Sequence, residues 1–326
     1  MDLINRLPQE IITEILMRLP YIFHKSLKQV CRAWRDMVRN SSFYDRRIDS
    51  GLSQKFICLL HRTGLTMYDP VRGFWHRSPP LPIGFKLAFS TRLVCWRRKL
   101  VFIGLKRYNR ETRSILVYDF CFNRWHVGTE MPEMQLIKRF VCCASPQGTV
   151  YVAGDRLAAV YDINTDEWEL LPPMPRPTGL ASVSFTGGKF YVFDLQNDEV
   201  QNFDPNTGLW TPTDNISGIQ HKENVLYAFG KLFVFGGQEI TEHDLENGNS
   251  RQVISFREVI LSKPGSAAVW CDRIVFAGVC YHSNGSSHRV LYMLKANAGV
   301  SERLIAINPA AEFRQTNVLS VTTVEL

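Results

Sequence analysis

The sequence lacks any apolar run that could span a membrane, and it lacks a secretion signal. No uninterrupted apolar stretch in its 326 residues approaches the roughly 18 that a membrane-spanning helix requires. The first residues also lack a basic segment followed by an apolar one, which is the pattern of a signal peptide. We therefore expect a soluble, unsecreted protein of the cytoplasm, the nucleus or both, with no membrane partner.

Paired cysteines are also missing. The eight cysteines occur at positions 31, 58, 95, 121, 142, 143, 271 and 280, and none of them forms a Cys-x-x-Cys motif. This spacing suits neither a disulfide framework nor a structural zinc site. We expect free thiols in a reducing compartment, with no metal ion and no cofactor.

The charge is basic in balance, but it lacks the dense basic runs of a nucleic-acid-binding arm. The net charge is +7 and the isoelectric point is near 9.0. The densest basic turn, Arg97 to Lys99, has no aromatic residues arranged for stacking on bases. A modest basic excess favours acidic partners, so we expect an acidic protein partner and no nucleic acid.

Motifs of common enzymes are absent. The sequence has no HExxH zinc motif, no GxSxG nucleophile elbow, no Walker A loop and no GxGxxG dinucleotide loop. Its eight histidines are scattered, with one close pair, His282 and His288, in a Ser/Gly-rich loop. We expect a protein that binds and does not catalyse.

One motif is repeated four times after residue 55. Each copy places a tryptophan six residues after an aromatic-Asp pair, in YDPVRGFW (68–75), YDFCFNRW (118–125), YDINTDEW (161–168) and FDPNTGLW (203–210). The repeated residues are Asp69, Asp119, Asp162, Asp204, Trp75, Trp125, Trp168 and Trp210. Apolar, strand-like runs begin at residues 55, 99, 149, 189, 231 and 273.

Strand-rich repeats of about 40 to 50 residues predict a β-propeller, in which each repeat is a blade of four strands. The six strand-like runs predict six blades. The aromatic residues then supply the surface that stacks one blade on the next. A β-sandwich with chance aromatics is the alternative, but it leaves the equal Asp-to-Trp spacings unexplained.

These copies resemble the kelch repeat, in degenerate form over residues 55–326, with the full diglycine kept only at Gly236 and Gly237. The first blade begins without a preceding inner strand. We therefore expect the C-terminal run at 317–326 to complete blade one and close the ring, which removes exposed sheet edges.

Residues 1–48 follow a helical pattern instead. Apolar residues fall on one helix face at Ile11, Ile12, Ile15, Leu16 and Leu19. Pro20 ends this helix, and a second helix is expected over residues 27–38. So few residues bury too little surface to be stable alone. The head must pack on the propeller or give its apolar surface to a partner.

The head resembles an F-box domain. The likeness rests on Leu-Pro at 7–8, Ile-Leu at 15–16, Leu-Pro at 19–20 and VCRAW at 30–34. F-box domains bind a Skp-type adaptor, which docks them on a cullin-RING ubiquitin ligase. The resemblance implies an adaptor-binding and helix-packing surface made of Leu7, Pro8, Ile12, Ile15, Leu16, Leu19 and Trp34. The segment between the helices departs from the family pattern, and a helical hairpin that only caps the propeller is the alternative.

The target is expected on the propeller face that carries the loops between second and third strands and the connections between blades, because variable loops on a rigid scaffold commonly carry recognition. The basic candidates there are Lys106, Arg107, Arg110, Arg113, Lys138, Arg139, Arg176, His61, Arg62 and Arg289. Acidic residues are expected on the same face over blades four and five, at Asp194, Asp198, Glu199, Glu239 and Glu242. Ordinary solvated loops are the alternative.

Together these features are similar to plant F-box/kelch-repeat proteins. The resemblance implies a non-catalytic substrate receptor of an SCF-type (Skp-cullin-F-box) E3 ubiquitin ligase, which brings a target to ubiquitination and proteasomal degradation. Phenylalanine ammonia-lyase and response regulators are targets of some such proteins, so the resemblance offers both as candidate targets of this chain. A kelch scaffold with a helical cap and a metal-dependent propeller enzyme are the other hypotheses.

Overall fold

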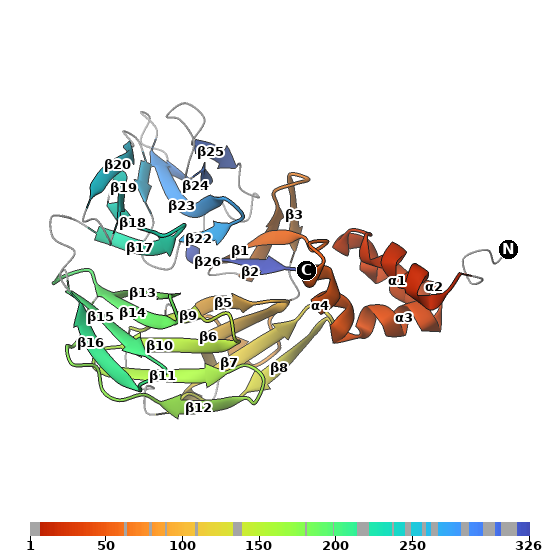
Figure 1. Cartoon of the computed structure of the whole chain (residues 1–326), viewed down its shortest axis with the longest axis horizontal. Coiled ribbons are helices and arrows are strands. Elements are labelled where there is room, and N and C mark those ends of the chain that lie inside the picture. The colour runs from red at the N-terminus through yellow and green to blue at the C-terminus, as the bar shows by residue number, and fades with distance from the viewer. Residues whose placement is uncertain are drawn as a thin grey trace.

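The chain forms a helical head attached to one edge of a six-bladed β-propeller (Figure 1). The structure is a computed structural model. It describes residues 7–61, 64–77, 80–88, 90–107, 110–132, 139–179, 181–197, 199–213, 222–236, 238–244, 249–255, 259–261, 267–281, 287–295, 304–307 and 318–326.

Four α-helices and one short 3-10 helix make up the head: α1 (Gln9–Met17), η2 (Tyr21–Phe23), α2 (His24–Val30), α3 (Arg32–Arg39) and α4 (Ser41–Asp49). Pro8 occupies the position before α1, where its missing N–H costs no helical hydrogen bond. Asn40 caps α4, with its side-chain oxygen accepting a hydrogen bond from the backbone N–H of Ser42 at 3.0 Å.

Six antiparallel sheets form the blades, each named here from the innermost strand outward. Blade one is β26 (Val318–Glu325), β1 (Lys55–His61), β2 (Gly64–Asp69) and β3 (Phe74–Arg77). Blade two is β5 (Arg92–Trp96), β6 (Lys99–Arg107), β7 (Arg110–Asp119) and β8 (Arg124–Gly128), and β4 (Phe85–Lys86) extends it beside β6. Blade three is β9 (Val141–Ala144), β10 (Thr149–Gly154), β11 (Leu157–Asp162) and β12 (Glu167–Leu170).

The remaining blades repeat this order. Blade four is β13 (Ala181–Thr186), β14 (Lys189–Asp194), β15 (Glu199–Asp204) and β16 (Leu209–Thr213). Blade five is β17 (Lys222–Ala228), β18 (Lys231–Gly236), β19 (Glu239–His243) and β20 (Ser250–Ser255). Blade six is β22 (Ala267–Trp270), β23 (Arg273–Tyr281), β24 (Ser287–Lys295) and β25 (Leu304–Ile307), with β21 (Val259–Leu261) also paired to β23.

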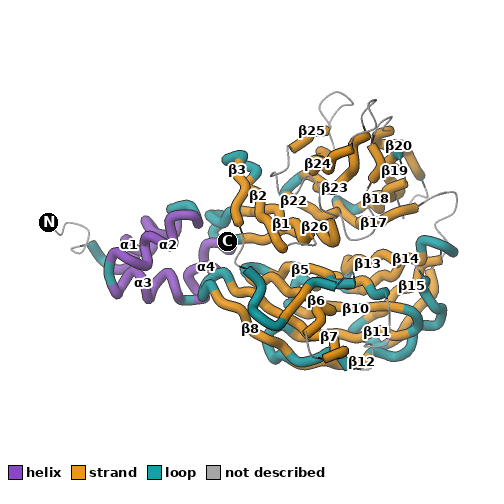
Figure 2. Tube along the Cα trace, turned by 180° about the vertical axis from the view of Figure 1, so that it is seen from behind, coloured by secondary structure: helices purple, strands orange, loops and turns teal. Residues whose placement is uncertain are grey.

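The ring closes through strands from the two ends of the propeller sequence. The C-terminal strand β26 pairs antiparallel with β1, from Lys55 opposite Glu325 to His61 opposite Val318. The six innermost strands contact one another in a circle, β26 to β5, β9, β13, β17, β22 and back to β26. Figure 2 shows the strands from behind, with the helices projecting from one side. Blade one therefore has no unpaired inner edge.

The core of the propeller lies between blades, in six apolar clusters. Alternate residues of one strand serve two different clusters, because successive side chains in a strand point to opposite faces. In β6, Leu100 and Phe102 pack toward blade one, whereas Val101 and Ile103 pack toward blade three. Each blade is thus held by both of its neighbours.

The repeated tryptophans add a hydrogen bond to this packing. The indole N–H of Trp125 donates to the carbonyl of Pro80 at 3.0 Å, that of Trp168 to Thr129 at 3.2 Å, and that of Trp210 to Pro172 at 2.8 Å. Each acceptor belongs to the connection from the preceding blade. The fourth repeated tryptophan, Trp75, pairs across the strand with Tyr68 at a ring separation of 4.8 Å.

The repeated aspartates hold the turns between third and fourth strands. The Oδ1 atoms of Asp69, Asp119, Asp162 and Asp204 accept hydrogen bonds from backbone N–H groups two or three residues further on. Asp162, for example, accepts from Asn164 at 2.6 Å. The short aspartate side chain satisfies backbone donors that the turn leaves without a partner.

Candidate functional site

The head has its own small core, and the propeller contributes to it. The buried residues are Leu16, Met17, Leu27, Val38, Phe43 and Tyr44 from the helices and Cys121 from the turn between β7 and β8. The thiol of Cys121 donates to the carbonyl of Arg39 at 3.1 Å. Burial is the main reason why the pKa of this thiol rises to about 11. Cys121 is therefore a neutral packing residue.

A buried arginine connects the head to the chain that enters and leaves blade one. Arg47 on α4 donates to the carbonyls of Met17 at 2.6 Å and Leu19 at 2.7 Å through one nitrogen, and to Leu52 at 3.2 Å and Leu326 at 3.3 Å through the other. Burial lowers its pKa. The guanidinium fork can satisfy several carbonyls at once, which a lysine cannot do.

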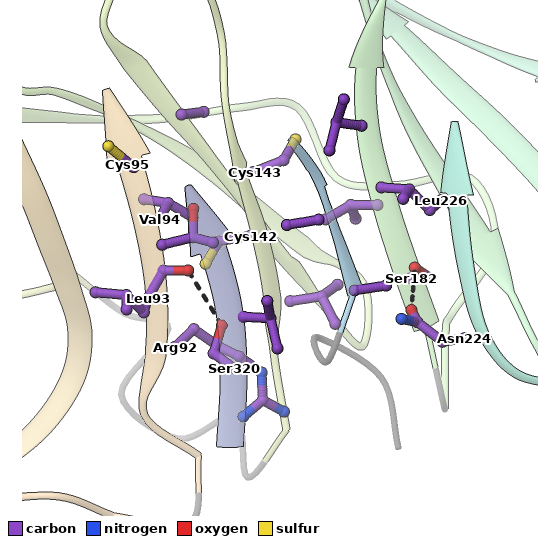
Figure 3. Close-up of a pocket in the computed structure, with 18 of the residues that line it drawn as sticks. Arg92, Leu93, Val94, Cys95, Cys142, Cys143, Ser182, Asn224, Leu226 and Ser320 are labelled. Atoms are coloured by element: carbon purple, nitrogen blue, oxygen red, sulfur yellow. Dashed lines mark hydrogen bonds between the residues drawn. The ribbon is translucent and has the colours of Figure 1, made fainter. Parts of the chain in front are cut away.

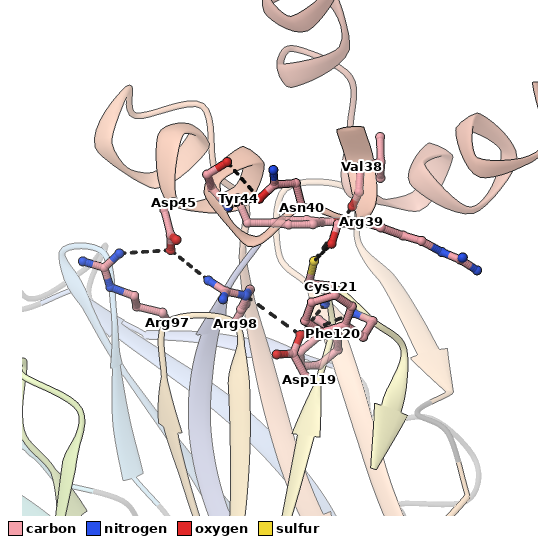
Figure 4. A network of polar contacts seen from close by, with 12 residues as sticks. Val38, Arg39, Asn40, Tyr44, Asp45, Arg97, Arg98, Asp119, Phe120 and Cys121 are labelled. Carbon is pink, nitrogen blue, oxygen red and sulfur yellow. Dashed lines mark hydrogen bonds and ion pairs between the residues drawn. The ribbon is translucent and has the colours of Figure 1, made fainter. Parts of the chain in front are cut away.

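Polar contacts fix the head on blade two (Figure 4). Asp45 of α4 accepts from Arg97 at 3.0 Å and from Arg98 at 2.8 Å, both in the turn between β5 and β6. Lys28 of α2 donates from Nζ to the carbonyl of Cys121 at 3.0 Å. The basic turn considered above for nucleic acid is therefore paired with the head.

One side of the head remains apolar and exposed. Ile11 and Ile15, one helical turn apart on α1, are each 46% exposed, and Leu7 just before the helix is 38% exposed. Val30, the last residue of α2, is 59% exposed. A row of exposed apolar residues along one helix and just before it, such as Leu7, Ile11 and Ile15, is typical of a surface that meets another protein.

The residues expected at the adaptor surface divide into two groups. Leu7, Pro8 and Ile15 are exposed, while Ile12, Leu19 and Trp34 are partly buried and pack against the core of the head. Leu16 is completely buried. Leu16 therefore holds the helices together and lies beneath the surface that a partner could touch.

The second helix expected over residues 27–38 is wrong in its extent. Cys31 adopts an extended backbone, with φ −155° and ψ 171°, and separates α2 from α3. The break lets Leu27 and Val38 enter the same core from two helix directions. Sequence reasoning also missed α4, although Asn40 followed by Ser41 and Ser42 is a helix-start signal.

The head lies at the end of the propeller that carries the turns within blade two, at Arg97–Arg98 and Phe120–Cys121. The hairpins between second and third strands end on the opposite side of the same sheet, because neighbouring strands are antiparallel. The face expected to bind a target therefore points away from the head.

The sequence suggested that the basic segment of blade two on that face is a loop. The structure shows that it is part of two strands. Strands β6 and β7 continue through it, with Lys106 opposite Arg113 and Arg107 opposite Arg110. Strand β4 adds Lys86 opposite Lys106. Main-chain pairing thus brings five basic residues of three strands, Lys86, Lys106, Arg107, Arg110 and Arg113, to one end of the sheet.

The other basic candidates are scattered. Arg139 is exposed just before β9, and Arg289 lies in β24, opposite Val279. His61 is only 3% exposed, so it packs in blade one and cannot meet a target. Lys138 and Arg62 lie outside the described residues. Within the close histidine pair, His288 lies in β24 and His282 falls outside the described part.

Arg176 braces its own loop. Its guanidinium pairs with Glu199 at 3.1 Å, and its backbone N–H and carbonyl both bond to the side chain of Gln201, at 3.3 and 2.9 Å. These contacts tie the connection between blades three and four to β15. Arg176 is therefore a structural residue of the rim and does not present a free charge.

The expected acidic half of the face is also largely neutralised. Glu242 is 4% exposed and bonds to Arg251 and, at 2.9 Å, to Lys231, which lowers its pKa against the effect of burial. Asp194 is buried and accepts from the backbone of Gln196 at 2.8 Å. Glu199 pairs with Arg176, and Asp198 lies outside the described residues. Glu239 remains, bonded to Gln252 at 2.6 Å.

The described residues contain neither a membrane-spanning helix nor a metal-binding cluster. No helix in the described ranges is both long and apolar enough to cross a membrane. In the same ranges, no group of three or more His, Cys, Asp or Glu residues could hold a metal ion. All eight cysteines are free.

Comparison with known proteins agrees with both parts of this architecture. Residues 4–46 match the F-box domain family. The F-box/kelch-repeat protein At1g80440 of Arabidopsis thaliana is 30% identical over 247 residues, covering 65% of this chain and 69% of the relative. At1g15670 of the same plant is 30% identical over 250 residues with the same coverage, and SKIP20 is 27% identical over 288 residues, covering 66% of this chain and 67% of the relative.

An F-box head on a kelch-type propeller is the general architecture of a substrate receptor of SCF-type ubiquitin ligases, a class of non-catalytic adaptor subunits. The chain belongs to the F-box/kelch-repeat protein family. It spans about two thirds of the length of the relatives named above.

Proposed function

We propose that this protein is the receptor subunit that carries a protein target to an SCF-type ubiquitin ligase for ubiquitination and proteasomal degradation. Its head binds a Skp-type adaptor, and through that adaptor a cullin-RING ligase. Its propeller holds the target close to the ligase, so that ubiquitin transfer becomes effectively intramolecular. This activity places the protein in the cytoplasm, the nucleus or both.

The observation that carries this proposal is the two-sided head. One side is used by the propeller, through Cys121, Arg98 and the carbonyls that Arg47 binds. The other side leaves Leu7, Ile11 and Ile15 in water. A helical cap needs only the first side. A partner that binds the second side would bury these apolar residues and so explain why they are exposed in the free protein. A few buried apolar residues commonly supply most of the affinity of an interface.

The target side is the end of blade two farthest from the head. Five basic residues meet there through the pairing of β4, β6 and β7, and Arg139 is exposed on the connection that follows blade two. An acidic surface on a target is the electrostatic complement of a sheet end that is rich in lysine and arginine. Such complementarity governs association rate and partner choice.

The test is adaptor binding by the full chain. A Skp-type adaptor is co-expressed with the wild type or with an Ile11→Ser, Ile15→Ser double variant, and complex formation is measured by co-purification and titration. We expect the double variant to bind at least about tenfold more weakly, because each exposed isoleucine that becomes buried contributes on the order of 1 kcal/mol or more. The folding of both proteins is compared by thermal unfolding.

The matched control is Leu209→Ser, which makes the same change of an exposed apolar residue, 65% exposed, on the propeller. It should bind the adaptor as the wild type does. If the wild type does not bind the adaptor, or if the double variant binds equally well, the head is a cap and the receptor proposal fails.

A further inference from the structure

The six innermost strands line a partly open cavity of about 280 Å³ on the propeller axis (Figure 3). Each blade contributes two to four wall residues, so all six blades line it. Its volume is close to the lower end of the range for small-molecule pockets, roughly 300 Å³. None of the described head residues, 7–49, is among those that line it.

The two ends of the cavity differ in polarity. Figure 3 shows Arg92, Ser182, Asn224 and Ser320 toward one end, near the start of their strands, and Cys95, Cys143 and Leu226 toward the other. Arg92 is the one charged residue among the described residues that line the cavity, and no carboxylate is among them. The walls between the two ends are mainly valine, alanine and leucine.

The hydroxyl groups of this polar end are directed to the protein itself. Ser320 donates to the carbonyl of Leu93 at 3.2 Å, and Ser182 donates to the carbonyl of Val225 at 2.7 Å. The Oδ1 of Asn224 accepts from the backbone N–H of Val225 at 2.9 Å, which leaves its Nδ2 as a donor. The guanidinium of Arg92, whose Nη1 donates to the carbonyl of Thr91 at 3.2 Å, and the amide of Asn224 lie at the same end of the cavity, on blades two and five.

We propose that this axial cavity binds a small organic anion, with one carboxylate or phosphate group at Arg92 and Asn224 and an apolar body along the walls. A guanidinium holds such groups through paired N–H donors. The cavity extends along β5 from Arg92 to Cys95, which is roughly 10 Å of strand. A ligand with an apolar body behind its anionic group therefore fills more of the cavity than a single acidic side chain of a protein target does.

The site is independent of the head, so its test does not depend on adaptor binding. Purified full-length protein is titrated with phenylacetate, phenyl phosphate and the neutral isostere phenylacetamide, with binding followed by ligand-observed NMR. We expect at least one of the two anions to bind saturably and phenylacetamide to bind at least about tenfold more weakly, which is the usual scale for losing one charge-assisted pair. The Arg92→Gln variant should lose this preference for charge.

Two further variants separate the site from effects on folding. Asn224→Asp keeps the oxygen that accepts from Val225 but places a negative charge at the polar end, so it should weaken anion binding while the fold is retained. Arg139→Gln removes an exposed cation outside the lining residues and should bind like the wild type. If neither anion binds, or if each binds equally to the Arg92→Gln and wild-type proteins, the proposal is overturned. Arg92-dependent binding of an acidic peptide, without binding of either small anion, would also overturn it and assign the polar end to a target.

Discussion

At the scale of single residues, the head depends on a buried histidine beside a buried arginine. His24 is 1% exposed, and its ring lies 3.1 Å from the hydroxyl of Tyr44 and 3.1 Å from the guanidinium of Arg47. Burial, followed by the charge of Arg47, lowers the pKa of His24 to about 4. The folded head therefore holds a neutral imidazole, whereas the unfolded chain protonates this ring near pH 6.5.

This difference predicts acid sensitivity of the head. The contribution of His24 to stability is complete above about pH 6.5 and is lost as the pH falls toward 4, because the unfolded state binds the proton more readily. The loss reaches on the order of 3 kcal/mol. Urea unfolding of the wild type and of His24→Gln should be measured between pH 7 and pH 4.5. The wild type should lose stability more steeply than the variant, and parallel curves would show that another group is responsible.

At the scale of the elements, blades two, three and four are each attached to the blade before by a packing surface and a tryptophan hydrogen bond. The ring of Trp168 lies tilted against that of Tyr161, with centroids 5.2 Å apart, and its N–H donates to the connection that leaves blade two. Trp270, which is not one of the four repeated tryptophans, donates to the carbonyl of Lys55 at 2.8 Å and so joins blade six to blade one, the next blade around the ring. The repeat spacing therefore predicts some of the tryptophan hydrogen bonds between blades and misses others.

Substitutions of Trp168 should separate the two contributions. Trp168→Phe keeps most of the apolar surface and loses the bond to Thr129, so we expect a loss of about 1 kcal/mol. Trp168→Ala also removes the packing, and about 3 kcal/mol is expected. Equilibrium denaturation measures both, with Leu170→Ala, an exposed position on the same strand, as the control. Equal losses for Phe and Ala would mean that the hydrogen bond, and not the ring, holds the blades together.

At the scale of the whole molecule, the C-terminal strand joins the ring and the head. Strand β26 is the innermost strand of blade one and contacts the inner strands of blades two and six. The residue that follows it, Leu326, forms a reciprocal backbone pair with Gln54 at 2.7 and 2.8 Å and also accepts from Arg47. Ring closure and head docking thus share one short segment.

Deletion of residues 318–326 should consequently unfold more than one blade. It removes the pairing partner of β1 along its whole length and exposes a sheet edge that favours aggregation. We expect loss of the cooperative thermal transition, which calorimetry would detect. Addition of a peptide with the sequence of residues 318–326 should restore a transition. A truncated protein that unfolds with the same midpoint as the full chain would contradict this role of β26.

Much of the architecture was predictable from spacing. Four Asp-to-Trp pairs and six apolar runs predicted a six-bladed propeller, and the structure confirms it. The F-box resemblance of the first residues is confirmed by the family match at 4–46. These features repeat locally, so the chain reveals them without knowledge of distant contacts. The break at Cys31 was not predictable, since it depends on how α2 and α3 share one core.

The candidate binding residues were less predictable, because charge in a sequence does not show where its partner lies. Arg98 meets Asp45 across 53 positions, Arg176 meets Glu199, and Glu242 is enclosed by Lys231 and Arg251. His61 appeared to be in a loop and is buried in a strand.

The amino-acid sequence by itself determined the class of this protein, its blade number and the identity of its head, because periodic apolar residues and short motifs act over a few neighbouring positions. Only the tertiary structure decided which charges are neutralised and which residues share the axial cavity. Arg92, Cys142, Asn224 and Ser320 come from four different blades. Residues so far apart in the chain come together only after the ring has closed, and no local sequence pattern predicts that contact.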